Sequence, residues 1–80
     1  MATKQILSPL PGTFYRRPAP EKPAYKEPGD IIAEGDALGL IEVMKTFYEV
    51  KSDTSGKIAR FLVENEEAVM AGQPLVEIEA

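Results

Sequence analysis

Residues 38–50 read Leu-Gly-Leu-Ile-Glu-Val-Met-Lys-Thr-Phe-Tyr-Glu-Val, and this stretch decides the fold. Apolar and β-branched residues dominate on both sides of its centre, as they do in strands. We therefore predict a β-hairpin with strands over residues 38–43 and 46–50. Met44 and Lys45 would form its turn.

A helix is the competing reading of this segment. Val43, Phe47 and Val50 fall at the i, i+4, i+7 spacing of a helical face, so a helix within residues 40–55 is also compatible with the pattern. In the rest of the chain, glycine and proline interrupt short stretches rich in Ile, Val, Phe and Tyr. Such punctuation is typical of strands, so an all-β domain is the first expectation.

An internal repeat favours the strands over the helix. Three residues recur 44 positions later, namely Ser8, Gly12 and Phe14 as Ser52, Gly56 and Ile58. Six more recur 37 positions later, namely Ile32, Gly35, Asp36, Leu38, Ile41 and Glu42 as Val69, Gly72, Gln73, Leu75, Ile78 and Glu79. Neither copy is long enough to bury its own apolar face, so the two should pack together as a pseudo-symmetric sandwich of two sheets.

The fall in offset from 44 to 37 means that the first copy carries 7 extra residues. They lie between Phe14 and Ile32, where the chain is rich in proline and charge. Too few residues precede this segment to form a domain, so it is not an interdomain linker. We expect one domain over residues 1–80, from which a proline-stiffened loop projects.

Composition excludes several classes of function. The chain has 80 residues, so its core is thin and a free-standing enzyme with a deep cavity is not expected. Without Cys or His it lacks the ligands of zinc and iron-sulfur sites and the usual catalytic triads. Dispersed basic residues and a net charge of −4 argue against nucleic acid as a partner. No stretch resembles a signal peptide or a membrane helix, so we expect a cytoplasmic protein without membrane contact.

The predicted turn breaks a local rule. Two-residue hairpin turns favour Asn-Gly or Asp-Gly because both turn residues take positive φ, and Met44-Lys45 is a poor choice. A lone Lys is ordinarily a solvated charge and a lone Met is ordinarily in the core. Here, however, both residues lie at the junction of the two repeats. Lys45 is therefore the candidate functional residue, with its amine presented to solvent.

Several motifs resemble those of one family. The segment Glu42-Val43-Met44-Lys45 resembles the Glu-Ala-Met-Lys attachment motif of biotinyl domains. Nearly the whole chain is similar to the biotin carboxyl carrier branch of these domains, through Gly12-Thr13-Phe14-Tyr15-Arg16, Gly35-Asp36-x-Leu38, Ser55-Gly56 and Pro74-Leu75-Val76-x-Ile78-Glu79. The resemblance implies a flattened barrel-sandwich hybrid of two four-stranded antiparallel sheets with pseudo-twofold symmetry. It also implies a protruding thumb, which corresponds here to about residues 19–26.

The resemblance further implies a non-catalytic carrier. A biotin protein ligase would read Met44 and join biotin covalently to the amine of Lys45. The domain would then carry carboxybiotin between a biotin carboxylase and a carboxyltransferase of an acetyl-CoA or related acyl-CoA carboxylase. Tyr25 and the thumb prolines would give the biotin a surface to rest on. Arg16 and Arg17, at the thumb base, would attract the carboxylate weakly or merely keep the loop soluble.

Other functions stay open on the sequence. An unmodified interaction or adaptor domain of the same sandwich type would leave Lys45 without a role. Lipoyl carrier domains share the fold, although they usually carry Asp-Lys-Ala at the tip, so Met44 favours biotin. A small enzyme using Glu42 with Lys45 would need a pocket that this short chain is not expected to supply.

Overall fold

The computed structural model describes residues 3–79, and it contains no helix there, hence none that could cross a membrane. The described chain forms eight strands, which are β1 (Thr3–Leu7), β2 (Gly12–Tyr15), β3 (Ile31–Ile32), β4 (Ala37–Val43), β5 (Thr46–Lys51), β6 (Gly56–Phe61), β7 (Glu67–Val69) and β8 (Pro74–Glu79). The competing helix within residues 40–55 is wrong. Phe47 is 57% exposed whereas Val50 is 3% exposed, so the two do not share one buried helical face.

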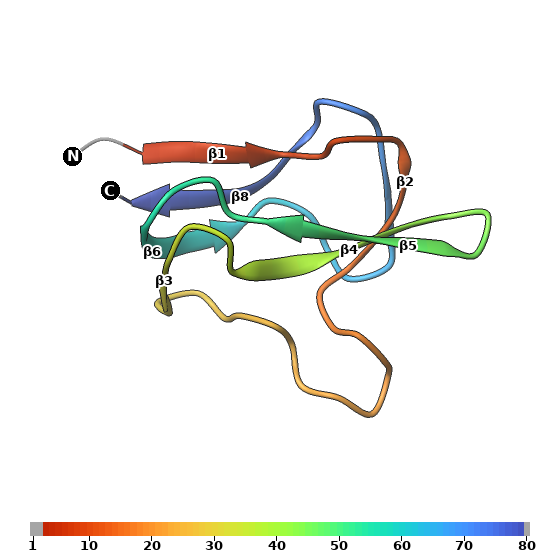
Figure 1. Ribbon diagram of the computed structural model, residues 1–80, viewed down its shortest axis with the longest axis horizontal. Coiled ribbons are helices and arrows are strands. Elements are labelled where there is room, and N and C mark those ends of the chain that lie inside the picture. Colours follow the sequence, from red (N-terminus) through yellow and green to blue (C-terminus); the bar gives the residue numbers. More distant parts are fainter. Residues whose placement is uncertain (1–2, 80) are drawn as a thin grey trace.

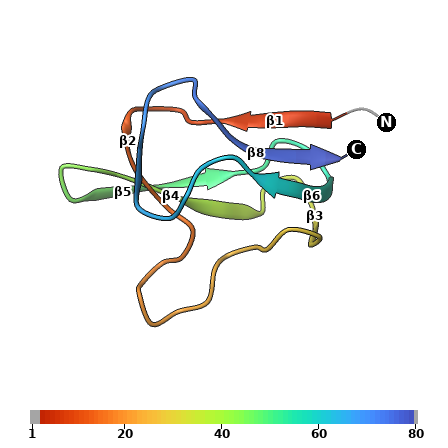
Figure 2. The same cartoon turned by 180° about the vertical axis from the view of Figure 1, so that it is seen from behind.

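The strands pair into two antiparallel sheets of four, in the orders β1-β8-β6-β3 and β5-β4-β2-β7. Exchanging β1 with β5, β8 with β4, β6 with β2 and β3 with β7 converts one order into the other. The two halves of the chain therefore contribute to both sheets under a pseudo-twofold axis. Figures 1 and 2 show the strands of the two sheets from opposite sides of the molecule. The predicted flattened sandwich is confirmed.

The repeat is visible in individual hydrogen bonds. Ser8 and Ser52 are each 3% exposed, and each hydroxyl donates to the carbonyl oxygen two residues later, at 2.7 and 2.5 Å. The carbonyl of Ser8 accepts the N–H of Gly72, and that of Ser52 accepts the N–H of Gly35. Gly35 and Gly72 have φ of 95° and 82°, a region in which glycine is favoured. The recurring serines and glycines thus build the same corner twice.

The core joins the two repeats. Fully buried large side chains come from both halves, namely Phe14, Leu38, Ile41, Ile58, Leu75, Val76 and Ile78. Three pairs among them are related by the repeat, Phe14 with Ile58, Leu38 with Leu75 and Ile41 with Ile78. Neither half could bury these residues alone, and this is why the halves fold as one unit.

The inserted segment runs between β2 and β3 and projects from the sandwich (Figure 1). Arg16 fastens its base, because the guanidinium lies 4.2 Å over the Phe61 ring and pairs with Glu27 at 2.9 Å. The N–H of Tyr25 donates to the Arg16 carbonyl at 2.9 Å, and Lys26 pairs with Asp36 at 3.7 Å. The loop is therefore held at both of its ends.

The repeat resumes at the end of the insertion. Glu27 N–H donates to the side chain of Asp30 at 2.8 Å, and Glu64 N–H donates to the side chain of Glu67 at the same distance. These two turns are 37 residues apart, so the extra residues lie between Phe14 and Glu27. This interval contains the predicted thumb at about residues 19–26.

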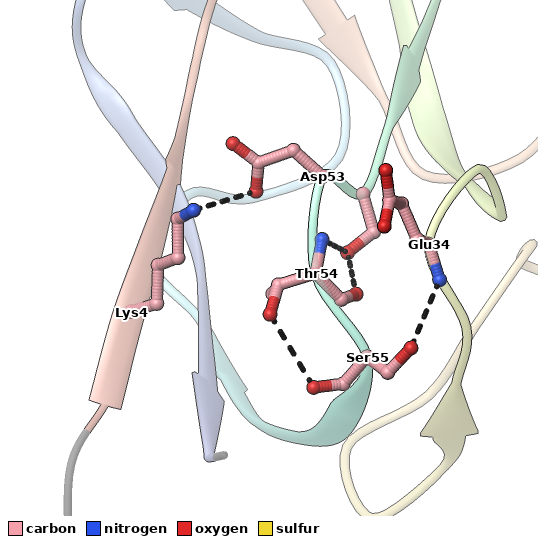
Figure 3. A network of polar contacts seen from close by, with 6 residues as sticks. Lys4, Glu34, Asp53, Thr54 and Ser55 are labelled. Atoms are coloured by element: carbon pink, nitrogen blue, oxygen red, sulfur yellow. Dashed lines mark hydrogen bonds and ion pairs between the residues drawn. The ribbon is translucent and has the colours of Figure 1, made fainter.

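A polar network closes the end of the sandwich at which the chain begins (Figure 3). Lys4 of β1 pairs with Asp53 at 3.2 Å, across to the turn between β5 and β6. The hydroxyl of Ser55 in the same turn accepts the N–H of Glu34 at 3.3 Å. β1 begins and β8 ends on this side of the sandwich, whereas the β4–β5 hairpin points the other way (Figure 1).

Candidate functional site

The site is the tip of the β4–β5 hairpin. Val43 pairs with Thr46, and only Met44 and Lys45 lie between them. Their φ angles of 51° and 66° are those of a type I′ turn, which matches the twist of the flanking strands. The predicted hairpin and its two-residue turn are confirmed, and Lys45 is exposed in the turn.

This turn is strained. Left-handed backbone costs roughly 1–2 kcal/mol for a residue with a side chain. Met44 is 92% exposed, so its side chain gains no burial that would offset this cost. The other described non-glycine residue with positive φ is Glu66, beside the inserted loop. Strain without a packing benefit points to a functional role for the tip.

Met44→Gly is expected to raise the free energy of unfolding by about 1 kcal/mol, because glycine removes the left-handed penalty and little buried area is lost. Thermal or urea unfolding measures the change. Lys57→Gly is the matched control, since Lys57 is an exposed strand residue without positive φ and should become less stable by about 0.5–1 kcal/mol. A Met44→Gly chain less stable than wild type would contradict the assignment of strain.

The outer face beside the tip carries an ordered pair. Tyr15 donates its hydroxyl to a Glu42 carboxylate oxygen at 2.8 Å, and its ring lies 6.4 Å from that of Phe47, tilted by 54°. The hydrogen bond to Glu42 raises the pKa of Tyr15, and burial and the charges of Glu42 and Glu66 add to the rise. Glu49, the other acidic residue near the tip, pairs with Lys51 at 3.7 Å.

A groove of about 260 Å³ opens between this face and the inserted loop. It is lined by Tyr15, Arg17, Pro18, Ala19, Pro20, Leu40, Phe47, Asn65 and Glu66. The Nε of Arg17 is buried and lacks a hydrogen-bond partner among residues 3–79. The same is true of the Nε of Arg16. The groove is mostly apolar, as small-ligand sites commonly are.

Tyr25 does not line this groove. Its pKa is raised by burial and, to a lesser extent, by the charge of Glu49. Arg16 is likewise committed to the loop base through Phe61 and Glu27. Of the two arginines at the thumb base, Arg17 is the one that contributes to the groove.

Two residues of the groove, Leu40 and Phe47, were not expected there from the sequence. They share the outer face of their sheet with Glu42, which strand alternation within residues 38–50 could have indicated. The sequence gives no indication that Glu66 lies at the groove. Glu66 reaches the groove from a turn in which its own backbone is left-handed, and no strand alternation predicts such a turn.

The arrangement offers an accessible primary amine at the tip of a hairpin whose strands contribute Leu40 and Phe47 to a small groove. Residues 3–79 contain no cluster of three or more acidic side chains that could hold a metal ion. A lysine amine is a nucleophile once deprotonated, and its long stem extends beyond the turn. The site is therefore suited to carrying a covalently attached group.

Comparison with known proteins gives one consistent family. A family model described as "Biotin-requiring enzyme" matches residues 4–78. The biotin carboxyl carrier protein of acetyl-CoA carboxylase from Nostoc sp. is 43% identical over 74 residues, which are 92% of this chain and 41% of that protein. The protein of the same name from Chlamydia muridarum is 42% identical over 73 residues, 91% of this chain and 45% of that protein. The chain thus spans less than half the length of these relatives.

Solved structures share the fold. The Kluyveromyces lactis urea carboxylase superposes with a TM-score of 0.80 and 29% identity, over 99% of this chain and 6% of that one. A single-chain, multi-domain long-chain acyl-CoA carboxylase superposes with a TM-score of 0.77 and 21% identity, over 94% of this chain and 7% of that one. In both, a small part of a much larger protein has this architecture.

Proposed function

This chain belongs to the family of biotin-requiring enzymes matched over residues 4–78, and from that premise we propose that it is a carrier of biotin bound covalently to Lys45. The observation that carries the proposal is the exposed amine on a strained turn at the hairpin tip. The domain itself performs no bond chemistry. It brings its prosthetic group to the active sites of partner enzymes.

Attachment requires an activated biotin carboxyl group, which a biotin protein ligase would supply. The Lys45 amine forms the new N–C bond while the bond from the carbonyl carbon to the leaving group breaks, and the amine proton passes to solvent. Met44, which is almost fully exposed next to Lys45, is the residue that we propose the ligase reads. When bound, biotin supplies a ureido nitrogen that accepts and releases a carboxyl group.

The groove lies within range of the attached group. Lysine stem and biotin chain together reach on the order of 14 Å. Phe47, at the groove, follows Lys45 by two residues, which is about 7 Å along a strand. We propose that the rings rest there against Pro18 and Pro20, in the groove that Arg17 also lines. The contact with Tyr25 stays a prediction.

Deleting residues 19–26 tests this resting place. The biotin rings of the modified chain are expected to become more mobile, as measured by NMR relaxation of isotope-labelled biotin. Tyr25→Ala is the matched variant, because it separates a specific role of Tyr25 from that of the groove wall. Unchanged ring mobility in the deletion would remove the thumb from the mechanism.

The partners follow from the relatives. Those from Nostoc sp. and Chlamydia muridarum are named as biotin carboxyl carrier proteins of acetyl-CoA carboxylase. The insertion between β2 and β3 corresponds to the thumb that the resemblance to that branch implies. We therefore propose a biotin carboxylase and a carboxyltransferase as partners, with acetyl-CoA or a related acyl-CoA as acceptor. A cytoplasmic location remains the prediction made from the sequence.

Intact mass distinguishes the candidate functions. After incubation with biotin, ATP and a biotin protein ligase, the carrier is expected to gain the mass of one biotin less water. A lipoyl carrier would gain lipoate instead when given lipoate, ATP and a lipoate ligase, and an unmodified adaptor would gain neither. No gain of biotin under conditions that modify a known biotinyl domain would contradict the proposal.

A further inference from the structure

Both acidic residues nearest the tip are engaged away from Lys45. Glu42 accepts the Tyr15 hydroxyl at 2.8 Å, and Glu49 pairs with Lys51 at 3.7 Å. Among the ion pairs of the described residues, none includes Lys45. The two acidic side chains that flank the tip in the sequence thus contact Tyr15 and Lys51 rather than Lys45.

We propose that Tyr15 is a positioning residue that withholds Glu42 from Lys45 and so leaves the amine free to be acylated. Glu42 precedes Lys45 by three residues, so their α carbons are at most about 11 Å apart, and the turn brings them closer. Side chains of this length can then meet. A carboxylate beside an ammonium favours the charged amine, which is not a nucleophile.

The surroundings of Tyr15 suit this role. Its ring packs against Phe47, which is the cross-strand partner of Glu42, so the hydroxyl is held over that carboxylate. A tyrosine hydroxyl is protonated near neutral pH, and the hydrogen bond to Glu42 raises the pKa of Tyr15 further, so the hydroxyl remains a donor. Glu66 is the other acidic residue that acts on Tyr15, and Arg17 lines the same groove. Neither is needed to hold Glu42.

The inference rests on the proposed function of Lys45, but its chemistry can be tested without a ligase. Trace acetic anhydride acetylates an unprotonated lysine amine: the N–C bond forms, the anhydride C–O bond breaks, acetate leaves and the amine proton passes to water. Mass spectrometry of peptides reports the rate at each lysine. Lys57, exposed on the other sheet, serves as the internal reference.

Tyr15→Phe keeps the ring and removes only the hydroxyl. Acetylation of Lys45 at pH 8 is expected to slow by about twofold to fivefold, the span of an exposed ion pair, and the pH profile moves to higher pH. High salt should shrink the difference. In the double variant Tyr15→Phe, Glu42→Gln, Lys45 should be acetylated at the wild-type rate, because the carboxylate that would pair with the amine is gone. Its free energy of unfolding should stay as low as that of Tyr15→Phe. A merely structural role of Tyr15 would not give this separation of rate from stability. An unchanged rate in Tyr15→Phe, or no rescue by Glu42→Gln, would overturn the inference.

A measurement on the wild-type chain keeps the inference testable should Tyr15→Phe fail to fold. Acetylation removes the charge of Lys45, and the ¹³C shift of the Glu42 carboxyl is expected not to respond, because Tyr15 holds that group. A clear response would show that Glu42 already pairs with Lys45. The ligase assay separates the two hypotheses. If the ligase attaches no biotin to Lys45 of the wild type, the proposed function is contradicted. If it does attach biotin, but Lys45 of Tyr15→Phe is acetylated at the wild-type rate, only the role of Tyr15 is contradicted.

Discussion

A chain carrying Lys45→Arg is expected to gain no mass with biotin, ATP and biotin protein ligase, whereas the wild type gains one biotin less water. The guanidinium keeps the positive charge of Lys45 but stays protonated and does not attack an activated carboxyl group. The loss is therefore expected to be complete. It should not be accompanied by unfolding, since residue 45 is exposed and the substitution leaves its neighbours in place.

The control for this experiment is Lys51→Arg, six residues away on β5 of the same hairpin. It is expected to take up biotin as the wild type does, because the amine at the tip is intact. Two outcomes would assign attachment elsewhere: biotin incorporated into Lys45→Arg, or lost from Lys51→Arg. Peptide mapping of the modified wild type locates the amide directly.

Phe14→Ala is expected to lower the free energy of unfolding by about 3–5 kcal/mol, the usual loss when a buried aromatic ring is truncated. Phe14 is fully buried, and its ring fills the space that Gly39 leaves open beneath β4. A domain of 80 residues has a total stability of roughly 4–12 kcal/mol, so this one substitution removes a large part of it. Urea unfolding monitored by circular dichroism measures the change.

Phe47→Ala is the matched control. Phe47 is 57% exposed on the outer face of the same sheet, so its truncation is expected to cost less than about 1 kcal/mol. Similar losses for the two variants would mean that the core is not organised around Phe14. Because Phe47 lines the groove, its removal is also a mild way to alter that surface without unfolding the domain.

The repeat explains how much of the fold could be predicted from the sequence. Recurring serines, glycines and core residues specify two equivalent halves, and an unfavourable Met44-Lys45 turn marks where they meet. Both sheets and the hairpin follow from this pattern. The inserted loop has no counterpart in the second half, so nothing in the repeat restrains its side chains. For that reason the sequence could not separate Arg16, which stacks on Phe61, from Arg17, which lines the groove.

Contacts across the outer face were also beyond the sequence. The hydrogen bond between Tyr15 and Glu42 joins β2 to β4, residues that are 27 positions apart in the chain. Alternation indicates which face each residue occupies, but it does not tell which hydroxyl meets which carboxylate. Such pairings depend on the register of the strands and on the position of neighbouring rings such as Phe47.

The two ends of the described chain leave the sandwich side by side, since Thr3 pairs with Glu79, and they do so at the pole opposite Lys45 (Figure 1). A flexible tether joined to either end would therefore be attached on the side of the domain opposite the β4–β5 hairpin. The longest dimension of the domain, 38 Å, would then add to the length of the tether, so that the lysine leads when the domain swings toward an active site.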